Sequence, residues 1–223
     1  MSIFVCVAGQ KVLPHRKRKI MKVDAGKILV DVGAEKKELR KRMKGILTSF
    51  FAENDVAAES RRVCEKFCSM KEFIEADVVL SFFTGNLEID TASLNARALA
   101  SKRLALPKVV SDTQIEFFFL SHGKSVESQL SPGAFGISEP AEGLEPLRLD
   151  SLSDKKLLVA VPGIAFTKGG ERCGHGKGYY DRFLSALKKA CPNAKAVGIC
   201  LPCQIVDSVP TDNFDIALDG VCF

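Results

Sequence analysis

The sequence predicts a single three-layer α/β domain, in which a mostly parallel sheet carries helices on both of its faces. Amphipathic helical segments alternate with short, continuously apolar segments, which is the pattern of parallel strands buried on both faces. The chain has 223 residues, of which 46% are hydrophobic and 26% are charged. Such a length and composition suit one large folded domain and exclude a disordered or fibrous protein.

The predicted elements follow one another from the first helix, which begins near Ala34. Apolar residues recur from Leu39 to Phe50 at the spacing of one helix face, with lysine and arginine on the other face. The later elements are a helix at about 56–69, a strand at 77–83, a helix at about 91–101 capped by Asp90 or Thr91, strands at 104–110 and 115–120, a long loop around 132–146, a strand at 157–161, a helix at 179–190, and strands at 195–200 and 220–223.

The net charge of +5 comes from the N-terminal part of the chain. Residues 1–44 contain thirteen basic and four acidic residues, whereas the rest contains nineteen basic and twenty-three acidic residues. Residues 1–33 show no sustained period, so we expect a loosely ordered basic extension followed by a domain over 34–223. Nucleic-acid association through this extension is the alternative from another class of function. We expect no nucleic-acid partner, because aromatic residues are not interleaved with the basic ones as base stacking requires.

Segments typical of membrane insertion or export are missing from the sequence. The longest nearly uninterrupted apolar segment, 157–166, is roughly half of the ~20 residues that a membrane helix needs. The apolar run at 3–8 lacks the basic residues that precede a secretory signal. We therefore expect a cytoplasmic protein with no membrane partner.

Eight cysteines raise the question of a disulfide, metal or redox function. The one C-x-x-C pair, Cys200 and Cys203, has no second pair of ligands at the spacing of a zinc site. It also follows a predicted strand, whereas a redox motif opens a helix. We expect buried thiols without such a function.

The segment most informative about function spans residues 161–184, VPGIAFTKGGERCGHGKGYYDRFL. It leads from a predicted buried strand into a helix through a glycine-rich loop that carries Arg172 and Lys177. Glycines allow backbone N–H groups to approach an anion closely, and a helix N-terminus and lysine add positive charge. The spacing matches neither a Walker A loop nor a dinucleotide fingerprint. The loop predicts a phosphate site, and the alternative is a turn that binds nothing.

Several motifs in order resemble the 5-formyltetrahydrofolate cyclo-ligase family, also called 5,10-methenyltetrahydrofolate synthetase. The resemblance covers about 36–223 and includes the glycine-rich segment. Its other elements are Lys36-Lys37-Glu38-Leu39-Arg40, Glu88-Ile89-Asp90-Thr91, Ala105-Leu106-Pro107-Lys108, Phe135-Gly136-Ile137-Ser138-Glu139-Pro140, and Val209-Pro210 with Asp215.

The resemblance implies an ATP-dependent ligase that acts on 5-formyltetrahydrofolate. In that family, ATP phosphorylates the formyl oxygen, N10 attacks the activated carbon, and loss of phosphate leaves 5,10-methenyltetrahydrofolate. The expected partners are therefore this folate and ATP, with Mg²⁺ as cofactor, and the expected form is a monomer. An enzyme of the same fold that binds another phosphate-containing substrate is the alternative.

The resemblance also implies roles for particular residues. Those implied to bind ATP are Lys36, Arg40, Arg172, Gly174, His175, Gly176, Lys177, Gly178, Tyr179 and Tyr180. Those implied to bind the folate are Phe83, Glu88 and, shared with the nucleotide, His175, Gly176, Lys177, Gly178 and Tyr179. Lys177 and Arg172 are implied to be catalytic, and Asp181 and Asp215 to hold Mg²⁺.

Each of these residues also has a purely structural interpretation. Lys36 and Arg40 suit a solvated helix face, Asp181 suits the positive end of its helix, and Phe83 suits the core. The chain also departs from the family pattern. Thr167 stands where the family commonly has aspartate, Cys173 where it has leucine, and His175 where it has arginine or another cation. Histidine is the weaker cation at neutral pH, so phosphate affinity is expected to be lower or dependent on pH.

Overall fold

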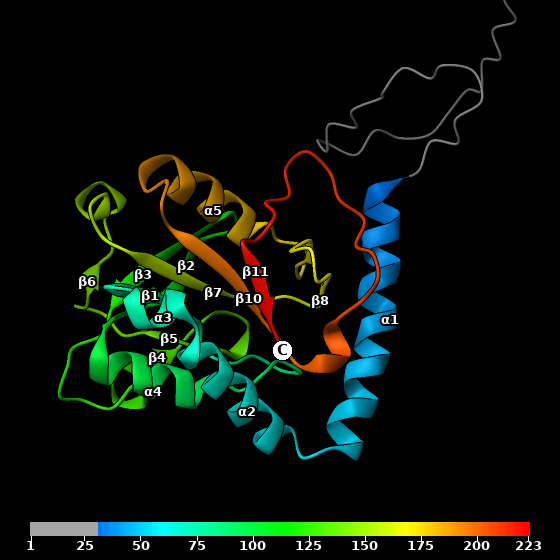
Figure 1. Cartoon of the computed structure of the whole chain (residues 1–223), viewed down its shortest axis with the longest axis horizontal. Coiled ribbons are helices and arrows are strands. Elements are labelled where there is room, and N and C mark those ends of the chain that lie inside the picture. The colour runs from blue at the N-terminus through cyan, green and yellow to red at the C-terminus, as the bar shows by residue number, and fades with distance from the viewer. Residues whose placement is uncertain (1–30) are drawn as a thin grey trace, which may run out of the picture. The chain divides into compact units, whose positions relative to one another are not determined.

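A seven-stranded sheet forms the centre of the computed structural model, which describes residues 31–223 (Figure 1). The strands lie in the order β11–β10–β7–β1–β2–β3–β6. The five strands from β11 to β2 are parallel, whereas β3 and β6 run antiparallel to their neighbours. Their bounds are β1 Val78–Leu80, β2 Arg103–Ser111, β3 Gln114–Phe119, β6 Glu145–Pro146, β7 Leu157–Val161, β10 Lys195–Ile199 and β11 Gly220–Cys222.

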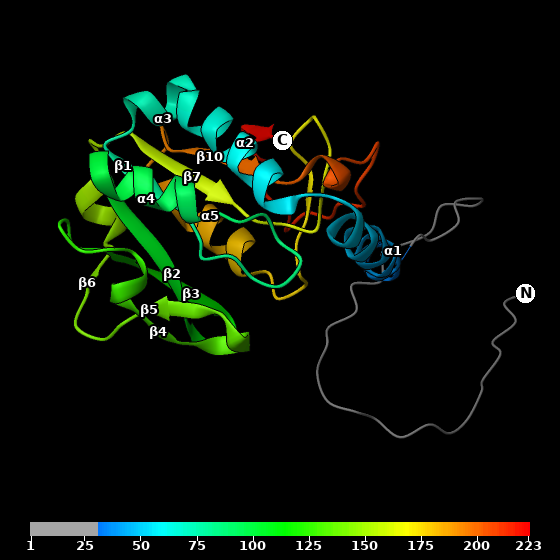
Figure 2. The ribbon, with the colours of Figure 1, turned by 90° about the horizontal axis from the view of Figure 1, so that it is seen from below.

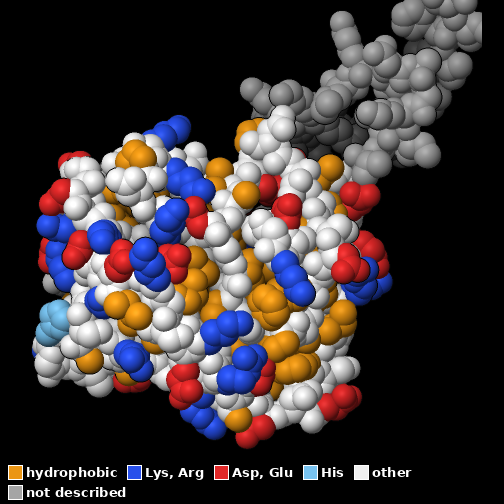
Figure 3. Space-filling view, viewed as in Figure 1, with side chains coloured by type: hydrophobic (Ala, Val, Ile, Leu, Met, Phe, Trp, Pro, Cys, Tyr) orange, Lys and Arg blue, Asp and Glu red, His pale blue; other side chains and the backbone are white. Residues whose placement is uncertain are grey.

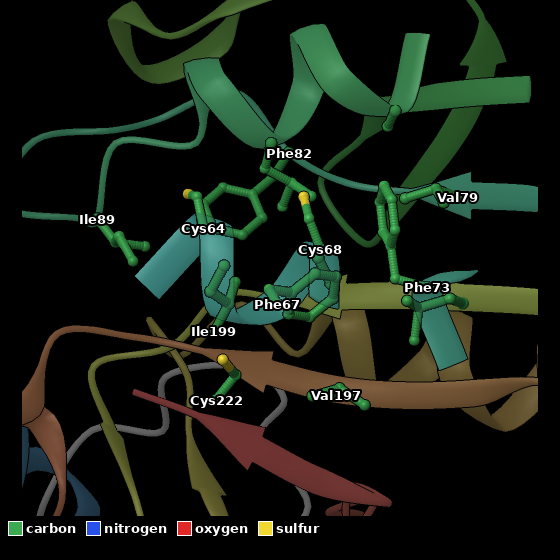
Figure 4. Packing of buried hydrophobic residues seen from close by; sticks show 14 of the residues in the cluster. Cys64, Phe67, Cys68, Phe73, Val79, Phe82, Ile89, Val197, Ile199 and Cys222 are labelled. Atoms are coloured by element: carbon green, nitrogen blue, oxygen red, sulfur yellow. The ribbon is translucent and has the colours of Figure 1, made fainter. Parts of the chain in front are cut away.

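Helices cover both faces of this sheet (Figure 2). Because side chains alternate along a strand, Leu158 and Ala160 of β7 join the core under α2 and α4, while Val159 joins the core under α5. Figure 4 shows the first of these cores. The rings of Phe67 and Phe73 pack edge to face there, with their centroids 6.4 Å apart. The helices are α1 Val32–Glu53, α2 Val56–Ser69, α3 Lys71–Glu75, α4 Ala92–Ser101 and α5 Tyr179–Ala190.

Helix α1 packs against two parts of the molecule, because its Leu47 joins the core under α2 and α4 while its first half packs against the segments that follow β7. Its buried Leu39 and Met43 form a separate cluster with Ala165, Cys173 and Val209. Ala165 belongs to the short hairpin β8 (Ala165–Phe166) and β9 (Arg172–Cys173). The cluster therefore fixes α1 beside the glycine-rich segment that the sequence singles out.

The predicted fold class is confirmed, and the long elements were predicted closely. The helix at 56–69, the strand at 157–161 and the helix at 179–190 have their predicted bounds. The first helix begins at Val32, two residues before Ala34, because the Asp31 carboxylate accepts hydrogen bonds from Gly33 and Ala34 at 3.0 and 3.2 Å.

Short elements depart from the prediction. The strand expected at 77–83 pairs only over 78–80, because the chain leaves the sheet there to form a wall of a cavity. Helix α3 and the antiparallel pairs β4 (Leu130–Pro132) with β5 (Ser138–Pro140) and β8 with β9 were not predicted. Two to five residues are too few to show a period.

Two other predictions concern the N-terminal extension and the cysteines. Of the extension expected over 1–33, residues 1–30 lie outside the described part, so the extension and its boundary stay predictions. Cys6 lies there too. The seven cysteines within residues 31–223 form no disulfide, and all but the half-buried Cys203 are buried. Burial raises the pKa of Cys203 to about 11 and also raises the pKa of Cys200, which disfavours thiolate chemistry at this C-x-x-C pair.

The visible surface of the described domain shows no large patch of one charge (Figure 3). On the face that Figure 3 shows, basic and acidic side chains are interspersed and leave hydrophobic side chains between them. None of the helices in residues 31–223 combines the length and the apolar character that crossing a bilayer requires.

Candidate active site

A cavity of about 1000 Å³ lies where α1, the glycine-rich segment and the loops after the parallel strands meet. Phe82 and Phe83 follow β1, Pro107 and Val109 belong to β2, and Pro162 follows β7. The carboxyl ends of parallel strands are the usual ligand site of such folds. The volume is at the upper end of the range for ligand pockets and leaves room for two substrates.

Helix α1 contributes Lys36 and Arg40, one turn apart on the side that faces the cavity. The Lys36 ammonium donates to Asp215 Oδ1 at 2.7 Å and to Asp212 Oδ2 at 3.0 Å, and its side chain is only 11% exposed. Arg40 Nε donates to the Gly174 carbonyl at 2.8 Å. The interpretation of these two residues as a solvated helix face is therefore wrong, since they join α1 to two distant segments.

The pairing of Lys36 with Asp212 favours the charged form of both side chains. Burial acts to lower the pKa of Lys36, but its hydrogen bonds to Asp215 and Asp212 outweigh burial and raise that pKa. Burial likewise acts to raise the pKa of Asp212. Hydrogen bonds from the Phe214 N–H and from Lys36 outweigh this and lower the pKa of Asp212 below its ordinary value. Lys36 and Asp212 are thus both charged at neutral pH.

This charge state leads to a prediction about acid stability. A carboxylate whose pKa is lowered on folding contributes stability above its unfolded pKa, and that contribution disappears as the pH falls through the folded pKa. We expect Asp212→Asn to melt a little below wild type at pH 7, since Asp212 is partly exposed. The gap should close as the pH falls below about 3.8, the ordinary pKa of this carboxyl group. Thermal melts of both proteins from pH 7 to pH 3 measure the gap, and a constant gap would contradict the assignment.

Arg172 in β9 is fixed at the base of the cavity. Its Nη2 donates to Asp181 Oδ1 at 2.9 Å, its Nη1 donates to the Pro162 carbonyl at 3.2 Å, and its side chain is 4% exposed. The same Asp181 oxygen accepts from the Ile216 N–H at 3.4 Å. Asp181 therefore joins β9, α5 and the C-terminal loop, in addition to lying near the positive end of its helix.

Two buried polar atoms at this wall have no hydrogen-bond partner within residues 31–223. They are Arg172 Nε and the Tyr180 hydroxyl, and both residues line the cavity. Burial raises the pKa of Tyr180 well above its ordinary value, so the phenol keeps its proton. Because buried polar groups are nearly always satisfied, two orphaned donors on one wall indicate that a ligand or water meets them.

The glycine-rich loop over 174–178 needs glycine at particular positions. Gly176 and Gly178 have φ of +97° and +67°, which L side chains rarely adopt. A Cβ at Gly174 would lie 2.7 Å from Arg172 Nη1, so the loop passes directly over the guanidinium. Helix α5 then begins without a side-chain cap, and Lys177, exposed on this loop, lines the cavity.

The opposite wall carries an acceptor, Glu88. Its Oε1 lies 2.8 Å from His175 Nε2 of the glycine-rich loop, and its Oε2 accepts from the Gly85 N–H at 2.8 Å. Leu87, next to it, has a φ of +56°, an uncommon conformation that is typical of functional loops. Phe83 is half-buried here and lines the cavity rather than the core, so its core interpretation is wrong.

All fourteen residues that the sequence singles out line this one cavity. The structure thus brings them together, while their individual roles stay predictions. Sequence reasoning missed several other wall residues: Asn86, Ile137, Glu139, Arg182, Asp212 and Phe214. Of these, Arg182 lies within the glycine-rich segment 161–184, Ile137 and Glu139 lie within the motif at 135–140, and Asp212 is one of three nearby C-terminal aspartates, so a signal existed for these four.

The three residues at which the chain departs from the family pattern differ in whether they line the cavity. Thr167 is in the β8–β9 turn, where its hydroxyl bonds to Glu171, and it does not line the cavity. Cys173 is buried beneath α1. His175 does line the cavity, and it pairs with Glu88 as described.

The carboxylates of the cavity fit a magnesium ion that binds together with phosphates. Among residues 31–223, no three acidic, histidine or cysteine side chains gather into a metal cage. Magnesium does not need one, because one or two carboxylates with phosphate oxygens and water suffice. Asp181 and Asp215 line the same cavity, and each is paired here with a cation, Arg172 or Lys36, that a triphosphate would also attract.

Comparison with known proteins identifies what the chain is similar to. Residues 32–223 match the model of the 5-formyltetrahydrofolate cyclo-ligase family. The structure of the Aquifex aeolicus 5,10-methenyltetrahydrofolate synthetase is 32% identical and superposes with a TM-score of 0.67 over 84% of this chain and 88% of that one. The 5-formyltetrahydrofolate cyclo-ligase of Saccharomyces cerevisiae is 29% identical over 169 residues, which are 74% of this chain and 76% of that protein. The mouse enzyme of the same name is 25% identical over 202 residues, which are 87% of this chain and 96% of that protein.

Proposed function

Because this chain belongs to the 5-formyltetrahydrofolate cyclo-ligase family, we propose that its cavity converts 5-formyltetrahydrofolate and ATP into 5,10-methenyltetrahydrofolate, ADP and phosphate. The resemblance seen in the motifs is confirmed by the family match. The observation that carries the proposal is that Lys36, Arg172 and Lys177 line the same cavity as the Glu88 carboxylate. Such a cavity can hold a nucleotide and a folate against each other.

The nucleotide half is supported by the positive charge that converges on the glycine-rich loop. Lys36, Arg40 and Lys177 line the cavity together with the buried Arg172, whose Nε lacks a partner in the described chain. Phosphoryl transfer needs fixed cations that neutralise the phosphate oxygens and hold the transferred group in line. These side chains, with the N–H groups at the start of α5, provide that environment.

Magnesium would be held by Asp181 and Asp215, with Asp212 beside them. When bound, it supplies further neutralisation of the phosphate charge. Lys36 and Arg172 hold these carboxylates in place before the nucleotide arrives, because both aspartates are already anchored by short bonds.

The folate half is supported by Glu88 and Phe83. Glu88 offers two carboxylate oxygens to the N–H donors of the pterin, and the Gly85 N–H fixes the orientation of the carboxylate. Phe83 provides an aromatic surface next to it. When the pterin binds the Glu88 carboxylate, His175 would lose its contact with Glu88. His175 would then be free to contact the transferred phosphate.

The reaction follows from this placement. The formyl oxygen attacks the γ-phosphorus, an O–P bond forms, and the bond to the ADP oxygen breaks. N10 then attacks the activated carbon and loses its proton to the departing phosphate, which leaves with the former formyl oxygen. The chain stabilises the first step through Lys177 and Arg172, which neutralise charge on the transferred group.

Methenyl formation is the direct test of this activity. The full chain, incubated with 5-formyltetrahydrofolate, ATP and Mg²⁺, should produce the near-ultraviolet absorbance of the methenyl product. Omission of ATP, or removal of the metal with a chelator, should abolish the signal. An unchanged rate without ATP would refute the ligase activity.

The Glu88→Gln variant tests the folate half on its own. An ionised acceptor is worth roughly 1.5–3 kcal/mol when it meets a ligand donor, so the KM for the folate should rise by about 10-fold or more. The KM for ATP should change much less. Steady-state kinetics with each substrate varied in turn provide the comparison, and equal changes in both KM values would make Glu88 a structural residue.

We also propose that the enzyme works as a cytoplasmic monomer without nucleic-acid or membrane partners. Side chains of a single chain supply both walls of the cavity, so no second copy is needed to complete it. Sedimentation of the full chain at assay concentration tests the monomer.

A further inference from the structure

Phe214 is more exposed than a large apolar side chain normally is in a folded domain. Its exposed fraction is 80%, the highest among the large hydrophobic residues whose burial the structure describes, and it lines the cavity. The next most exposed, Ile74 at 63%, belongs to α3 and is not part of the cavity wall. An aromatic ring in water at the wall of a ligand site is typical of a ring that the ligand covers.

The turn that carries Phe214 is closed by its own hydrogen bonds. The Phe214 N–H donates to Asp212 Oδ1 at 2.8 Å, and the Asp212 N–H donates to Asp215 Oδ2 at 2.6 Å. Both aspartates are also bound by Lys36 of α1. In Figures 1 and 2 the C-terminal segment runs beside α1, in agreement with these contacts. The ring is thus held at the cavity by a fixed turn and cannot easily fold back onto the core.

We propose that Phe214 stacks on the base of the nucleotide. The inference rests on the proposed function, which assigns the cavity wall around Lys36 and Arg40 to the phosphates. The base is the large planar part of a nucleotide and is joined to its phosphates through a single ribose, so it must lie close to that wall. Glu88, the acceptor proposed for the folate, contacts His175 and Gly85, whereas the turn that carries Phe214 is bound by Lys36. The position of Phe214 on the Lys36-bound turn therefore favours the base over the pterin.

Stacking has a distinctive consequence for specificity. Every nucleic-acid base has a π-face, so the contact strengthens binding without selecting among bases. Phe214→Ala should weaken binding of Mg-ATP by about 10-fold to 100-fold, which is the loss usual for one base–aromatic stack. Binding of Mg-GTP should weaken by the same factor. Inorganic tripolyphosphate, which has no base, should bind equally well to both proteins.

The experiment measures the dissociation constants of Mg-ATP, Mg-GTP and tripolyphosphate by equilibrium titration. Four full-length proteins are compared: wild type, Phe214→Ala, Phe214→Trp and Ile74→Ala. We expect Phe214→Trp to retain the affinity for ATP and GTP, and Ile74→Ala, the matched loss of an exposed apolar side chain, to behave as wild type. Equal losses for ATP and tripolyphosphate would mean that the turn had been disturbed, and would overturn the inference. Unchanged ATP affinity in Phe214→Ala, or a change confined to the folate KM, would overturn it as well.

Failure of the proposed function would look different. If wild type binds ATP but forms no methenyl product, the ligase activity is wrong, while the comparison of ATP with tripolyphosphate still decides whether Phe214 stacks on the base.

Discussion

Lys177→Ala should lower kcat/KM for methenyl formation by about 10²–10³-fold, the usual cost of losing one fixed electrostatic stabiliser of a transition state. Lys177 lies between two glycines that take left-handed conformations, so the backbone wraps around the same space that its ammonium reaches. The melting temperature should stay within about a degree or two of wild type, since an exposed loop lysine buries little apolar area.

Two variants serve as controls for Lys177. Lys168→Ala removes an exposed lysine from the neighbouring β8–β9 turn, which does not line the cavity, and should leave kcat/KM unchanged. Lys177→Arg keeps the charge with a different shape and should recover part of the activity. If Lys177→Ala melts normally and turns over within two-fold of wild type, the glycine-rich loop is a turn and not a phosphate site.

Arg172→Met should lower the free energy of unfolding by about 3 kcal/mol, the lower end of the usual cost of breaking a buried ion pair. The side chain is 4% exposed and holds both Asp181 and the Pro162 carbonyl. Its removal leaves the Asp181 carboxylate without its cation. Because Asp181 is itself 21% exposed, water offsets part of the loss. Urea unfolding of wild type and variant measures the difference.

Surface pairs provide the matched control for Arg172. Arg62 lies 2.6 Å from Glu59 on α2 but is 50% exposed, so Arg62→Met should lower the free energy of unfolding far less than Arg172→Met does. The double variant Arg172→Met/Asp181→Asn should recover part of the stability, because it removes the uncompensated charge. Equal costs for Arg172→Met and Arg62→Met would show that burial of the Arg172 pair is unimportant.

The sequence predicts best those elements whose signal is local and repeated. Strand β7 is apolar at every position, and α5 has a wide apolar face, so both ends of each could be placed. Strand β1 was predicted too long, since Phe82 and Phe83 are as apolar as the strand but lie beyond its paired residues: Phe82 packs into the core under α2 and α4, and Phe83 lines the cavity. Apolar character alone cannot separate a strand from a cavity wall.

The composition of the candidate site was predicted better than its contacts. The family motifs, which occur in the expected order along the sequence, contain the candidate residues that line the cavity. Nothing local indicates that Lys36 binds Asp212 and Asp215, since 176 and 179 residues separate the partners. For the same reason the closed turn that presents Phe214 could not be predicted, because its shape depends partly on a lysine at the other end of the domain.

The contact between Lys36 and the two aspartates also determines when the site can exist during synthesis of the chain. Helix α1 is among the first described segments to leave the ribosome, and the turn that completes its wall of the cavity is among the last. A nascent or prematurely terminated chain that lacks residues 212–215 has the lysine and the glycine-rich loop but not the aspartates that bind the lysine. Closing so long a loop is slow and costs entropy, so the cavity is assembled late in folding. Incomplete chains are therefore expected to consume no ATP.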